Sequence, residues 1–369
     1  MLNISAIFAA QIDVQMRLKK IILLTLLFGI FVHSYGQKTG SKIDKEDLSA
    51  FIKTLSSIQF EGRALDNNGH IKTQEFIVKR YMELQLEPFS SDGYLEKFYL
   101  NQTSRGDLYL ITPNNRTLSN NDSVMINREM KQISETENEI VFGGYGSEDE
   151  DRKVEVANVV GLIKGESEKL IVISAHYDHV GWLDKEDTTN YYPGADDNAS
   201  GVAALLELAE EFSQYKNLKY SMMFLATTGE EGGLLGSSYH VNHPDFDPER
   251  VVCNFNLDMI SRCDAQQDDC FYLYCISDER SQWLDSLVRE ADKIFPHCSF
   301  IYSSNDTDIF SRTDTYNFSK KGIPSILFFA GFHDDYHQIT DTMEKIDFDI
   351  LANRVKLIGE VLKMLQNDQ

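Results

Sequence analysis

The stretch LIVISAHYDHVG (residues 170–181) joins a continuous apolar run to a cluster of polar and titratable residues. Its first half, LIVISA, lacks the alternation of apolar and polar residues that marks a strand with one face in water. Continuous apolar strands are typical of parallel sheets that helices cover on both faces. The second half places His176 and Asp178 directly after this run, so we expect both side chains near the carboxyl end of a buried strand.

Strand and helix patterns alternate along the chain from about residue 156 onward. This alternation predicts an α/β fold with a mostly parallel central sheet and helices on both faces. An irregular β-rich section is expected at about 93–150. Helical periodicity is present at 44–56, 70–86, 201–215, 280–295 and 347–366, and strand-like apolar runs at 220–226, 251–260, 271–276 and 325–330.

The N-terminal segment MRLKKIILLTLLFGIFVHSYGQ (16–37) has a basic start, a short apolar run and an end of small and polar residues. This pattern is typical of a secretory signal peptide, and the run is shorter than the roughly 20 apolar residues that a spanning helix needs. We therefore predict a signal peptide over 1–37, with residues 1–15 as a misplaced start, and a single domain over 38–369. The alternative is an N-terminal membrane anchor.

The chain of 369 residues carries a formal net charge of −23. Such an acidic protein repels phosphate backbones, so its composition argues against a nucleic-acid partner. The sequence contains five cysteines, and an odd number leaves at least one thiol free or paired with another chain. Cys263 and Cys270 bracket the polar loop DAQQDD and could form a disulfide.

Polar and titratable residues follow the other predicted strands as well. In open α/β sheets, ligand sites form outside the carboxyl ends of the strands, so these residues are expected at one rim of the sheet. They lie in TTGEEGG (227–233), at Asp258, in PGADDNASG (193–201) and in GFHDDYHQITDT (331–342).

Imidazoles and ionised carboxylates gathered at one rim form a ligand set that fits zinc. Two ions that share a bridging carboxylate can polarise a carbonyl group and stabilise a tetrahedral intermediate. In the pair Glu230–Glu231, one carboxylate can bind metal while the other serves as a general base. Taken singly, the motifs also have ordinary interpretations, such as a helix N-cap for DDNASG. The sequence contains no G-x-S-x-G, no H-E-x-x-H and no phosphate-binding loop.

Together, these motifs resemble the co-catalytic zinc exopeptidases, a group that includes bacterial leucyl aminopeptidase, aminopeptidase Y and glutamate carboxypeptidase II. The resemblance implies a phosphorylase/hydrolase-like α/β fold and two zinc ions per chain. It covers roughly residues 156–366, and its matching stretches are AHYDHVG, PGADDNASG, TTGEEGGLLGS, NLDMI and DYHQITDT.

The resemblance also implies roles for individual residues. Glu230 would be the general base, which takes a proton from the zinc-bound water and passes it to the leaving amine. Asp178 would orient the ring of His176, and Tyr336 would donate to the oxyanion. The stretch RTDTY (312–316) departs from the family pattern, so substrate preference is not carried over. The implied metal ligands are His176, Asp197, Glu231, Asp258 and His337, with Asp197 bridging the two ions.

The resulting interpretation is an exported zinc aminopeptidase, periplasmic or extracellular, that hydrolyses N-terminal residues from peptides. Its expected partner is a peptide substrate, with no nucleic acid and no stable membrane association after signal cleavage. One alternative is a glutaminyl-peptide cyclotransferase, because glutaminyl cyclases share this fold but use one zinc and typically lack the first His ligand. The intact HYDH at 176–179 favours hydrolysis. A second alternative is a non-enzymatic binding descendant.

Overall fold

The computed structural model describes most of the chain after residue 42, with a few gaps. The predicted signal peptide lies outside the described residues, and so does the strand-like segment EIVFGGYG (139–146). The described residues are 43–91, 93–102, 108–110, 123–126, 129–132, 152–184, 189–243, 246–295, 298–303 and 307–367.

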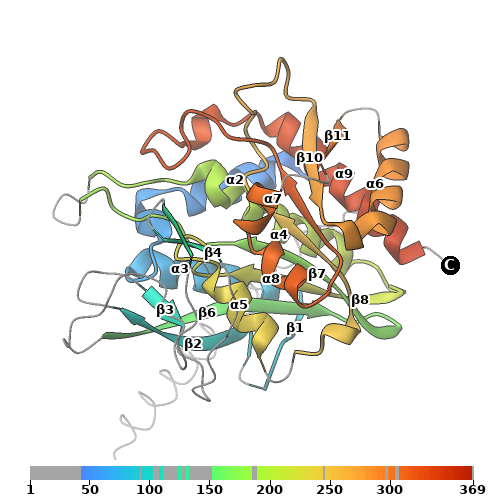
Figure 1. The fold of residues 1–369 in the computed structure, drawn as a ribbon, viewed down its shortest axis with the longest axis horizontal. Helices are drawn as coiled ribbons and strands as arrows, with labels where there is room; N and C mark the ends of the chain where they lie inside the picture. The colour runs from blue at the N-terminus through green and yellow to red at the C-terminus, as the bar shows by residue number, and fades with distance from the viewer. Residues whose placement is uncertain are drawn as a thin grey trace, which may run out of the picture. The chain divides into compact units, whose positions relative to one another are not determined.

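Most of the strands form one large sheet, and helices lie on either side of it (Figure 1). The strands are β1 (Glu87–Pro88), β2 (Leu95–Gln102), β3 (Leu108–Leu110), β4 (Ser123–Ile126), β5 (Glu129–Gln132), β6 (Arg152–Ile163), β7 (Ser167–His176), β8 (Tyr220–Thr227), β9 (Val251–Leu257), β10 (Tyr272–Ser277), β11 (Ser299–Ser303) and β12 (Ser325–Phe329).

The helices predicted from periodicity are all present, within a few residues of their expected bounds. The α-helices of the described residues are α2 (Lys45–Leu55), α3 (Asn68–Glu83), α4 (Gly201–Ser213), α5 (Leu235–Asn242), α6 (Gln282–Ile294), α7 (Thr307–Ser311), α8 (Thr315–Lys320) and α9 (Phe348–Asn367). Short helical turns lie at Ile58–Arg63, Ala195–Ser200, Pro248–Arg250, Glu279–Ser281 and Met343–Lys345. Among the helices that the structure describes, none has both the length and the apolar character to cross a membrane.

The large sheet has ten strands, in the order β11-β10-β12-β9-β7-β8-β6-β2-β3, with β1 paired to β6. Its centre is parallel, because β12, β9, β7 and β8 all run in the same direction. On both sides of this centre the direction reverses, at β6 next to β8 and at β10 next to β12. The predicted α/β class is therefore confirmed, while the sheet is mixed and parallel only at its centre.

The expected β-rich section at 93–150 contributes β2 and β3 to one flank of the large sheet. In β2, Glu96, Phe98 and Leu100 are buried, whereas Lys97 and Tyr99 between them are exposed. This alternation is typical of an antiparallel strand with one face in water, and β2 pairs with β6 in that way. β4 and β5 form a separate antiparallel pair.

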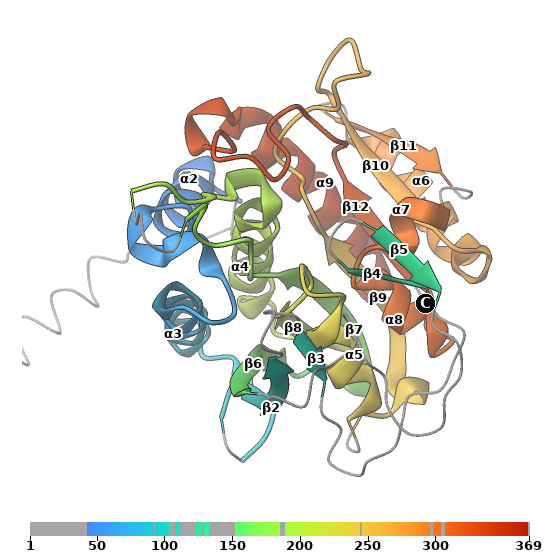
Figure 2. The same ribbon diagram turned by 60° about the vertical axis from the view of Figure 1, so that its left-hand side comes forward.

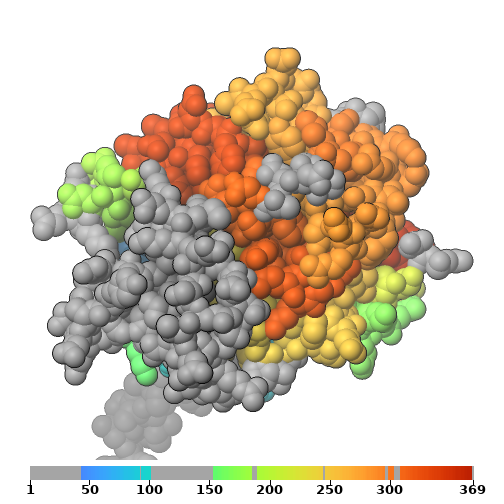
Figure 3. All heavy atoms as spheres, viewed as in Figure 1, coloured from blue at the N-terminus to red at the C-terminus, as the bar shows by residue number. Residues whose placement is uncertain are grey.

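Both faces of β7 are buried, which explains the unbroken apolar run LIVISA. Ile171 and Ile173 pack into a core shared with α2, α3, α4, α6 and α9. Val172 faces the other way, into a cluster with Val241 of α5 and Phe318 of α8. Figure 2 shows α2, α3 and α4 on the opposite side of the sheet from α5 and α8. Most of the coloured part of the face in Figure 3 belongs to the C-terminal half of the chain, shown in yellow to red.

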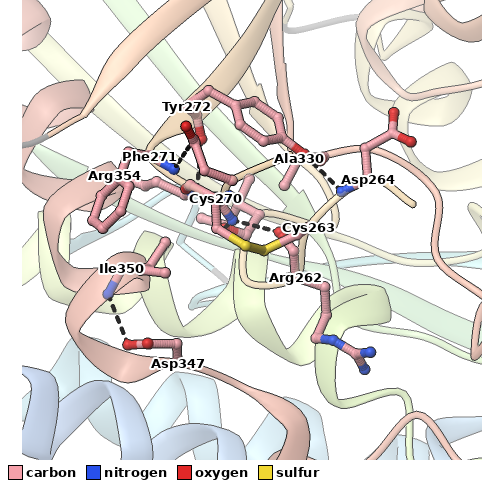
Figure 4. The surroundings of a disulfide bond; sticks show 12 residues. Arg262, Cys263, Asp264, Cys270, Phe271, Tyr272, Ala330, Asp347, Ile350 and Arg354 are labelled. Carbon is pink, nitrogen blue, oxygen red and sulfur yellow. Dashed lines mark hydrogen bonds between the residues drawn. A yellow bond between two sulfur atoms is a disulfide. The ribbon is translucent and has the colours of Figure 1, made fainter. Parts of the chain in front are cut away.

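A disulfide joins Cys263 to Cys270, as expected, and closes the loop between β9 and β10 (Figure 4). Arg354 of α9 is fully buried beneath this loop. Its guanidinium donates to the carbonyl oxygens of Ile260, Arg262, Cys270 and Tyr272. Cys253, Cys275 and Cys298 are buried and are in no disulfide.

An acidic cluster lies between α2 and α4. Oxygen atoms of Asp47, Glu207 and Glu210 lie within 4.8 Å of one another. Glu210 forms an ion pair with Arg80, whereas Glu207 accepts only a backbone N–H, that of Asp44 at 3.0 Å. Burial, reinforced by the two neighbouring carboxylates, raises the pKa of Glu207 to about 8.

The Glu207→Gln substitution should make the protein more stable relative to the wild type as pH rises. The folded wild type keeps a proton on Glu207 that the unfolded chain releases above about pH 4.3, so its free energy of unfolding falls between about pH 4 and pH 8. Glutamine does not titrate and avoids this loss. Urea unfolding of both proteins at pH 5, 6.5 and 8 measures the effect. A difference in stability that is the same at all three pH values would contradict the prediction.

Candidate metal centre

The carboxyl ends of the four parallel strands bring the predicted ligands to one edge of the sheet. His176 is the last residue of β7, and Asp258 directly follows β9. Glu231 lies in the turn after β8, and His337 in the loop after β12. Asp197 belongs to the helical turn Ala195–Ser200 that leads into α4.

Three of these side chains form a first group of atoms that could bind a metal ion, which we call metal-binding atoms: His176, Asp197 and Asp258. The Nε2 atom of His176 lies 3.3 Å from Oδ1 of Asp197 and 3.3 Å from Oδ1 of Asp258. All three side chains are buried. The group therefore presents one imidazole nitrogen and two carboxylates to a common, sheltered point.

A second group shares Asp197 and adds Glu231, His337 and His179. The Nε2 atom of His337 lies 2.9 Å from Oδ2 of Asp197 and 3.1 Å from Oε2 of Glu231. The Nδ1 atom of His179 lies 2.8 Å from Oε1 of Glu231. Asp197 thus presents its two oxygen atoms to different groups, which is the arrangement expected of a bridging carboxylate.

In the second group, two imidazole nitrogens are buried without a hydrogen-bond partner among the described residues. Nε2 of His337 is buried beside two carboxylate oxygens but is aligned for a hydrogen bond with neither. Nε2 of His179 is also buried with no hydrogen-bond partner among the described residues. An imidazole nitrogen that is buried beside carboxylate oxygens without a hydrogen bond, as Nε2 of His337 is, fits the donor set of a zinc ion.

The titration of these groups shows how strongly the site favours positive charge. Burial alone would lower the pKa of His176, but the carboxylates of Asp258 and Glu230 raise it well above its usual range. Burial alone would raise the pKa of Asp197, but the adjacent imidazoles of His176 and His337 lower it well below its usual range. The crowded carboxylates favour protonated imidazoles, because the added positive charge compensates their negative charge. A divalent cation would compensate the same negative charge.

Glu230 belongs to neither group of ligands, although it is adjacent to Glu231. The backbone N–H groups of Glu230 and Glu231 donate to the two carboxylate oxygens of Asp178, at 3.2 and 3.3 Å. Burial and the neighbouring carboxylates of Asp258 and Glu231 raise the pKa of Glu230. The turn thus leaves one glutamate among the ligand atoms and the other as a carboxyl group with high proton affinity.

Asp178 lies beside His176, but the contact differs from the expected one. The closest carboxylate oxygen of Asp178 is 3.8 Å from Nδ1 of His176, too far for a hydrogen bond. Nδ1 instead lies 3.2 Å from the backbone carbonyl oxygen of Asp178. The Asp178 carboxylate acts on the turn at Glu230 and Glu231, and its backbone orients the imidazole.

Tyr336 packs against the site through its ring. The ring stacks on that of His337, with ring centroids 3.9 Å apart. It also packs edge-on against the ring of Phe332, with centroids 5.1 Å apart. Burial and the nearby carboxylates of Asp197 and Glu231 raise the pKa of Tyr336. The phenol is therefore a neutral hydroxyl beside the acidic cluster.

Asp196 and Asp197 are adjacent in sequence but have different surroundings. The carboxylate of Asp196 accepts hydrogen bonds from the backbone and hydroxyl groups of Ser261 and from Nε2 of His333. The carboxylate of Asp341 accepts the backbone N–H groups of both Asp196 and Asp197, at 3.1 Å. These contacts hold the turn with the side chain of Asp197 among the metal-binding atoms.

Asn158 of β6 fixes the turn that carries the paired glutamates. Its Oδ1 accepts the backbone N–H of Thr228 at 3.1 Å, and its Nδ2 donates to the carbonyl oxygen of Gly236 at 2.9 Å. The N–H of Gly236 in turn donates to the carbonyl oxygen of Thr228. The same Nδ2 donates to buried Glu96. One amide side chain therefore closes both ends of the turn.

Sequence reasoning missed three side chains that the structure brings to the site. His179 was visible in the HYDH motif, but its place in the motif did not show that it would reach Glu231. Asp341 was visible in QITDT, but its hydrogen bonds to residues about 145 positions away were not predictable. Asp314, in the divergent stretch RTDTY, is buried and accepts hydrogen bonds from Thr227 and Ser237.

A comparison with known protein families identifies the group to which this fold and site belong. The sequence model described as peptidase family M28 matches residues 158–362, which is more than half of the chain. The chain belongs to peptidase family M28. The match contains all five predicted ligands and Glu230.

Curated relatives of this M28 chain include aminopeptidases. It is 27% identical over 238 residues to a probable leucine aminopeptidase of Trichophyton verrucosum, a match that covers 62% of each chain. It is 28% identical over 212 residues to aminopeptidase YwaD of Bacillus subtilis, a match that covers 54% of this chain and 43% of the relative. The chain thus spans less than two thirds of the length of these relatives.

Solved structures share the fold at low sequence identity. A zinc aminopeptidase from Bacillus subtilis aligns with a TM-score of 0.62 and 18% identity, covering 88% of this chain and 96% of the other. A glutaminyl cyclase from Bacteroides thetaiotaomicron aligns with a TM-score of 0.58 and 17% identity, covering 87% of this chain and 98% of the other. Peptidases and cyclases therefore share this architecture, and the fold alone does not distinguish them.

The Asn158→Ala substitution should lower the free energy of unfolding by about 2–4 kcal/mol, because it leaves a buried N–H and a buried carbonyl without partners. Urea unfolding measures the change. Asn254→Ala is a matched control in β9, since Asn254 is equally buried but its Nδ2 donates only to the Ser174 hydroxyl. An equal loss in the two variants would show that the turn contacts add nothing.

Proposed function

We propose that this chain is a zinc-dependent aminopeptidase that removes N-terminal residues from peptides. The observation that carries the proposal is that buried Asp197 joins two groups of candidate metal ligands, while Glu230 stays outside both. Family M28 membership and the similarity to aminopeptidases support a peptide substrate. Export through the N-terminal signal peptide is part of the same proposal.

In this proposal, His176 and Asp258 would hold one zinc ion, Glu231 and His337 would hold a second, and Asp197 would be shared between the two. When bound, the two ions supply Lewis-acid chemistry, which polarises the peptide carbonyl and acidifies a water molecule. His179 lies close enough to Glu231 to orient its carboxylate. The buried surroundings exclude bulk water, so each charge acts more strongly than it would in solvent.

Glu230 is the proposed general base. Its raised pKa suits a carboxylate that accepts a proton from the attacking water and later passes it to the leaving amine. Asp178 holds the backbone of the turn, so the carboxylate of Glu230 stays near the ligand atoms without joining them. The hydroxyl of Tyr336, neutral at physiological pH, is the proposed donor to the oxyanion.

A glutaminyl cyclase is the competing function, because solved cyclases share the fold. In this chain His176 occupies the position of the first metal ligand and lies against both Asp197 and Asp258. The first group of metal-binding atoms, His176, Asp197 and Asp258, is therefore complete. Its completeness supports a site for two ions, and so supports hydrolysis over cyclisation.

The purified protein should hydrolyse aminoacyl anilides, lose this activity when a chelator removes its metal, and regain it when zinc is added. A panel of aminoacyl anilides, peptides with a blocked N-terminus and peptides with N-terminal Gln separates the candidate functions. Cyclisation of N-terminal Gln without hydrolysis of the anilides would favour the cyclase. Full activity after exhaustive metal removal would overturn the proposal.

The Glu230→Gln variant should lose at least about 100-fold in kcat while its zinc content stays near that of the wild type, because it removes the base and no ligand. Metal analysis of the purified variant checks the second half of this statement. Glu231→Gln is the matched control at the neighbouring position, and it should lose zinc. If the zinc loss occurs in Glu230→Gln instead, the two roles are exchanged.

A further inference from the structure

Arg63 is one of the most deeply buried side chains in the described part of the chain, with only 1% of its surface exposed. It ends the short helical turn Ile58–Arg63, far in sequence from the metal-binding motifs. A guanidinium group has five N–H donors in a rigid, planar arrangement. A buried charge is costly unless it is paired or hydrogen-bonded, so the partners of Arg63 show what it does.

All the partners of the Arg63 guanidinium are backbone carbonyl oxygens. Nε donates to Tyr177, Nη1 donates to Leu55 and Pro193, and Nη2 donates to Gly194 and Asp197, at 2.8 to 3.3 Å. Tyr177 directly follows the proposed ligand His176, and Asp197 is itself the proposed bridging ligand. Four of the five contacts therefore hold the two segments that present these ligands.

The backbone next to Arg63 adds contacts to the same region. The carbonyl oxygen of Arg63 accepts the N–H of His179 at 3.3 Å, and that of Gly62 accepts the N–H of Gly181 at 3.0 Å. Gly62 has a φ of 63°, and a Cβ at this position would collide with the carbonyl oxygens of Gly181 and Tyr192. The turn thus fits against the segment after β7 so closely that a side chain at position 62 has no room.

The charge of Arg63 also acts on the site. Burial lowers the pKa of Arg63 to about 10, so the group stays positively charged at neutral pH. The negative charges of Asp197, Asp341, Asp178 and Glu231 act in the opposite direction and raise this pKa. The positive charge of Arg63 therefore offsets part of the negative charge of these carboxylates. Its hydrogen bond to Asp197 is made to the backbone carbonyl oxygen.

We propose that Arg63 is a positioning residue for the metal centre. It sets the distance between the end of β7 and the turn Ala195–Ser200, and so places His176 and Asp197 for the same ion. The segment before residue 158, which the family match does not include, thereby takes part in forming the site. This inference rests on the ligand set given under the proposed function.

Arg63→Lys tests the inference, because lysine keeps the positive charge but cannot reach five carbonyl groups at once. Arg354→Lys is the matched control: Arg354 is equally buried and donates to four carbonyl oxygens between Ile260 and Tyr272, around the disulfide (Figure 4). None of these acceptors lies in the segments that carry His176 and Asp197. Both variants are prepared metal-free, and circular dichroism and urea unfolding establish that they fold. Competition with a fluorescent chelator then gives the Kd for zinc.

The Kd of Arg63→Lys for zinc should rise about 10-fold or more, the usual effect of removing a group that orients metal ligands. The absorption bands of the cobalt-substituted protein, which report ligand geometry, should shift in this variant only. Arg354→Lys should keep the zinc Kd and the cobalt spectrum of the wild type. An unchanged Kd and spectrum in Arg63→Lys, or equal changes in both variants, would overturn the inference.

The unaltered protein provides a second measurement, which is needed if Arg63→Lys fails to fold. Coupling between two sites is reciprocal, so zinc should stabilise the contacts of the Arg63 segment if these contacts favour zinc binding. Zinc should then slow hydrogen exchange at the amides of His179 and Gly181, and unchanged exchange would contradict the inference. A wild-type protein that binds no zinc would overturn the proposed function as well, whereas normal zinc binding with no effect of Arg63 would overturn only this inference.

Discussion

The repulsion among buried carboxylates at one edge of the sheet is the constraint on which the rest of this structure depends. Asp178, Asp197 and Asp258 are buried there, with Glu230 and Glu231 next to them. A protein interior tolerates such a cluster only where positive charge or hydrogen-bond donors compensate it. The chain supplies imidazoles, backbone N–H groups and one buried guanidinium, and a metal ion would supply the remainder.

The fold meets this constraint by giving neighbouring acidic residues different tasks. Glu231 lies among the metal-binding atoms, whereas Glu230 does not. Asp197 also lies among these atoms, whereas the carboxylate of Asp196 accepts hydrogen bonds from Ser261 and His333. In both pairs the backbone is held by the carboxylate of another aspartate, Asp178 or Asp341, which accepts consecutive N–H groups. Turns fixed through their backbones leave the side chains free for chemistry.

Much of the scaffold could be predicted from local patterns. The apolar runs at β7, β8, β9 and β12 became the parallel centre of the sheet, and the periodic segments became α2, α3, α4, α6 and α9. The predicted ligands came together because parallel strands end at one edge. Strand direction at the flanks was not predictable in the same way, since a strand's partner is chosen by its packing and by the connections on either side of it.

By itself, the sequence predicted which residues would lie together at one edge of the sheet, because a titratable side chain directly after a buried strand must lie at the strand end. It also left a disulfide between Cys263 and Cys270 open as a possibility, since they bracket one short loop, and the structure contains this disulfide. Only the tertiary structure decided how those residues are held. His179, Asp341 and Arg63 act on groups that are distant in the chain or belong to the backbone. Such contacts leave no local pattern, because every residue offers the same carbonyl and N–H groups until the fold selects a few.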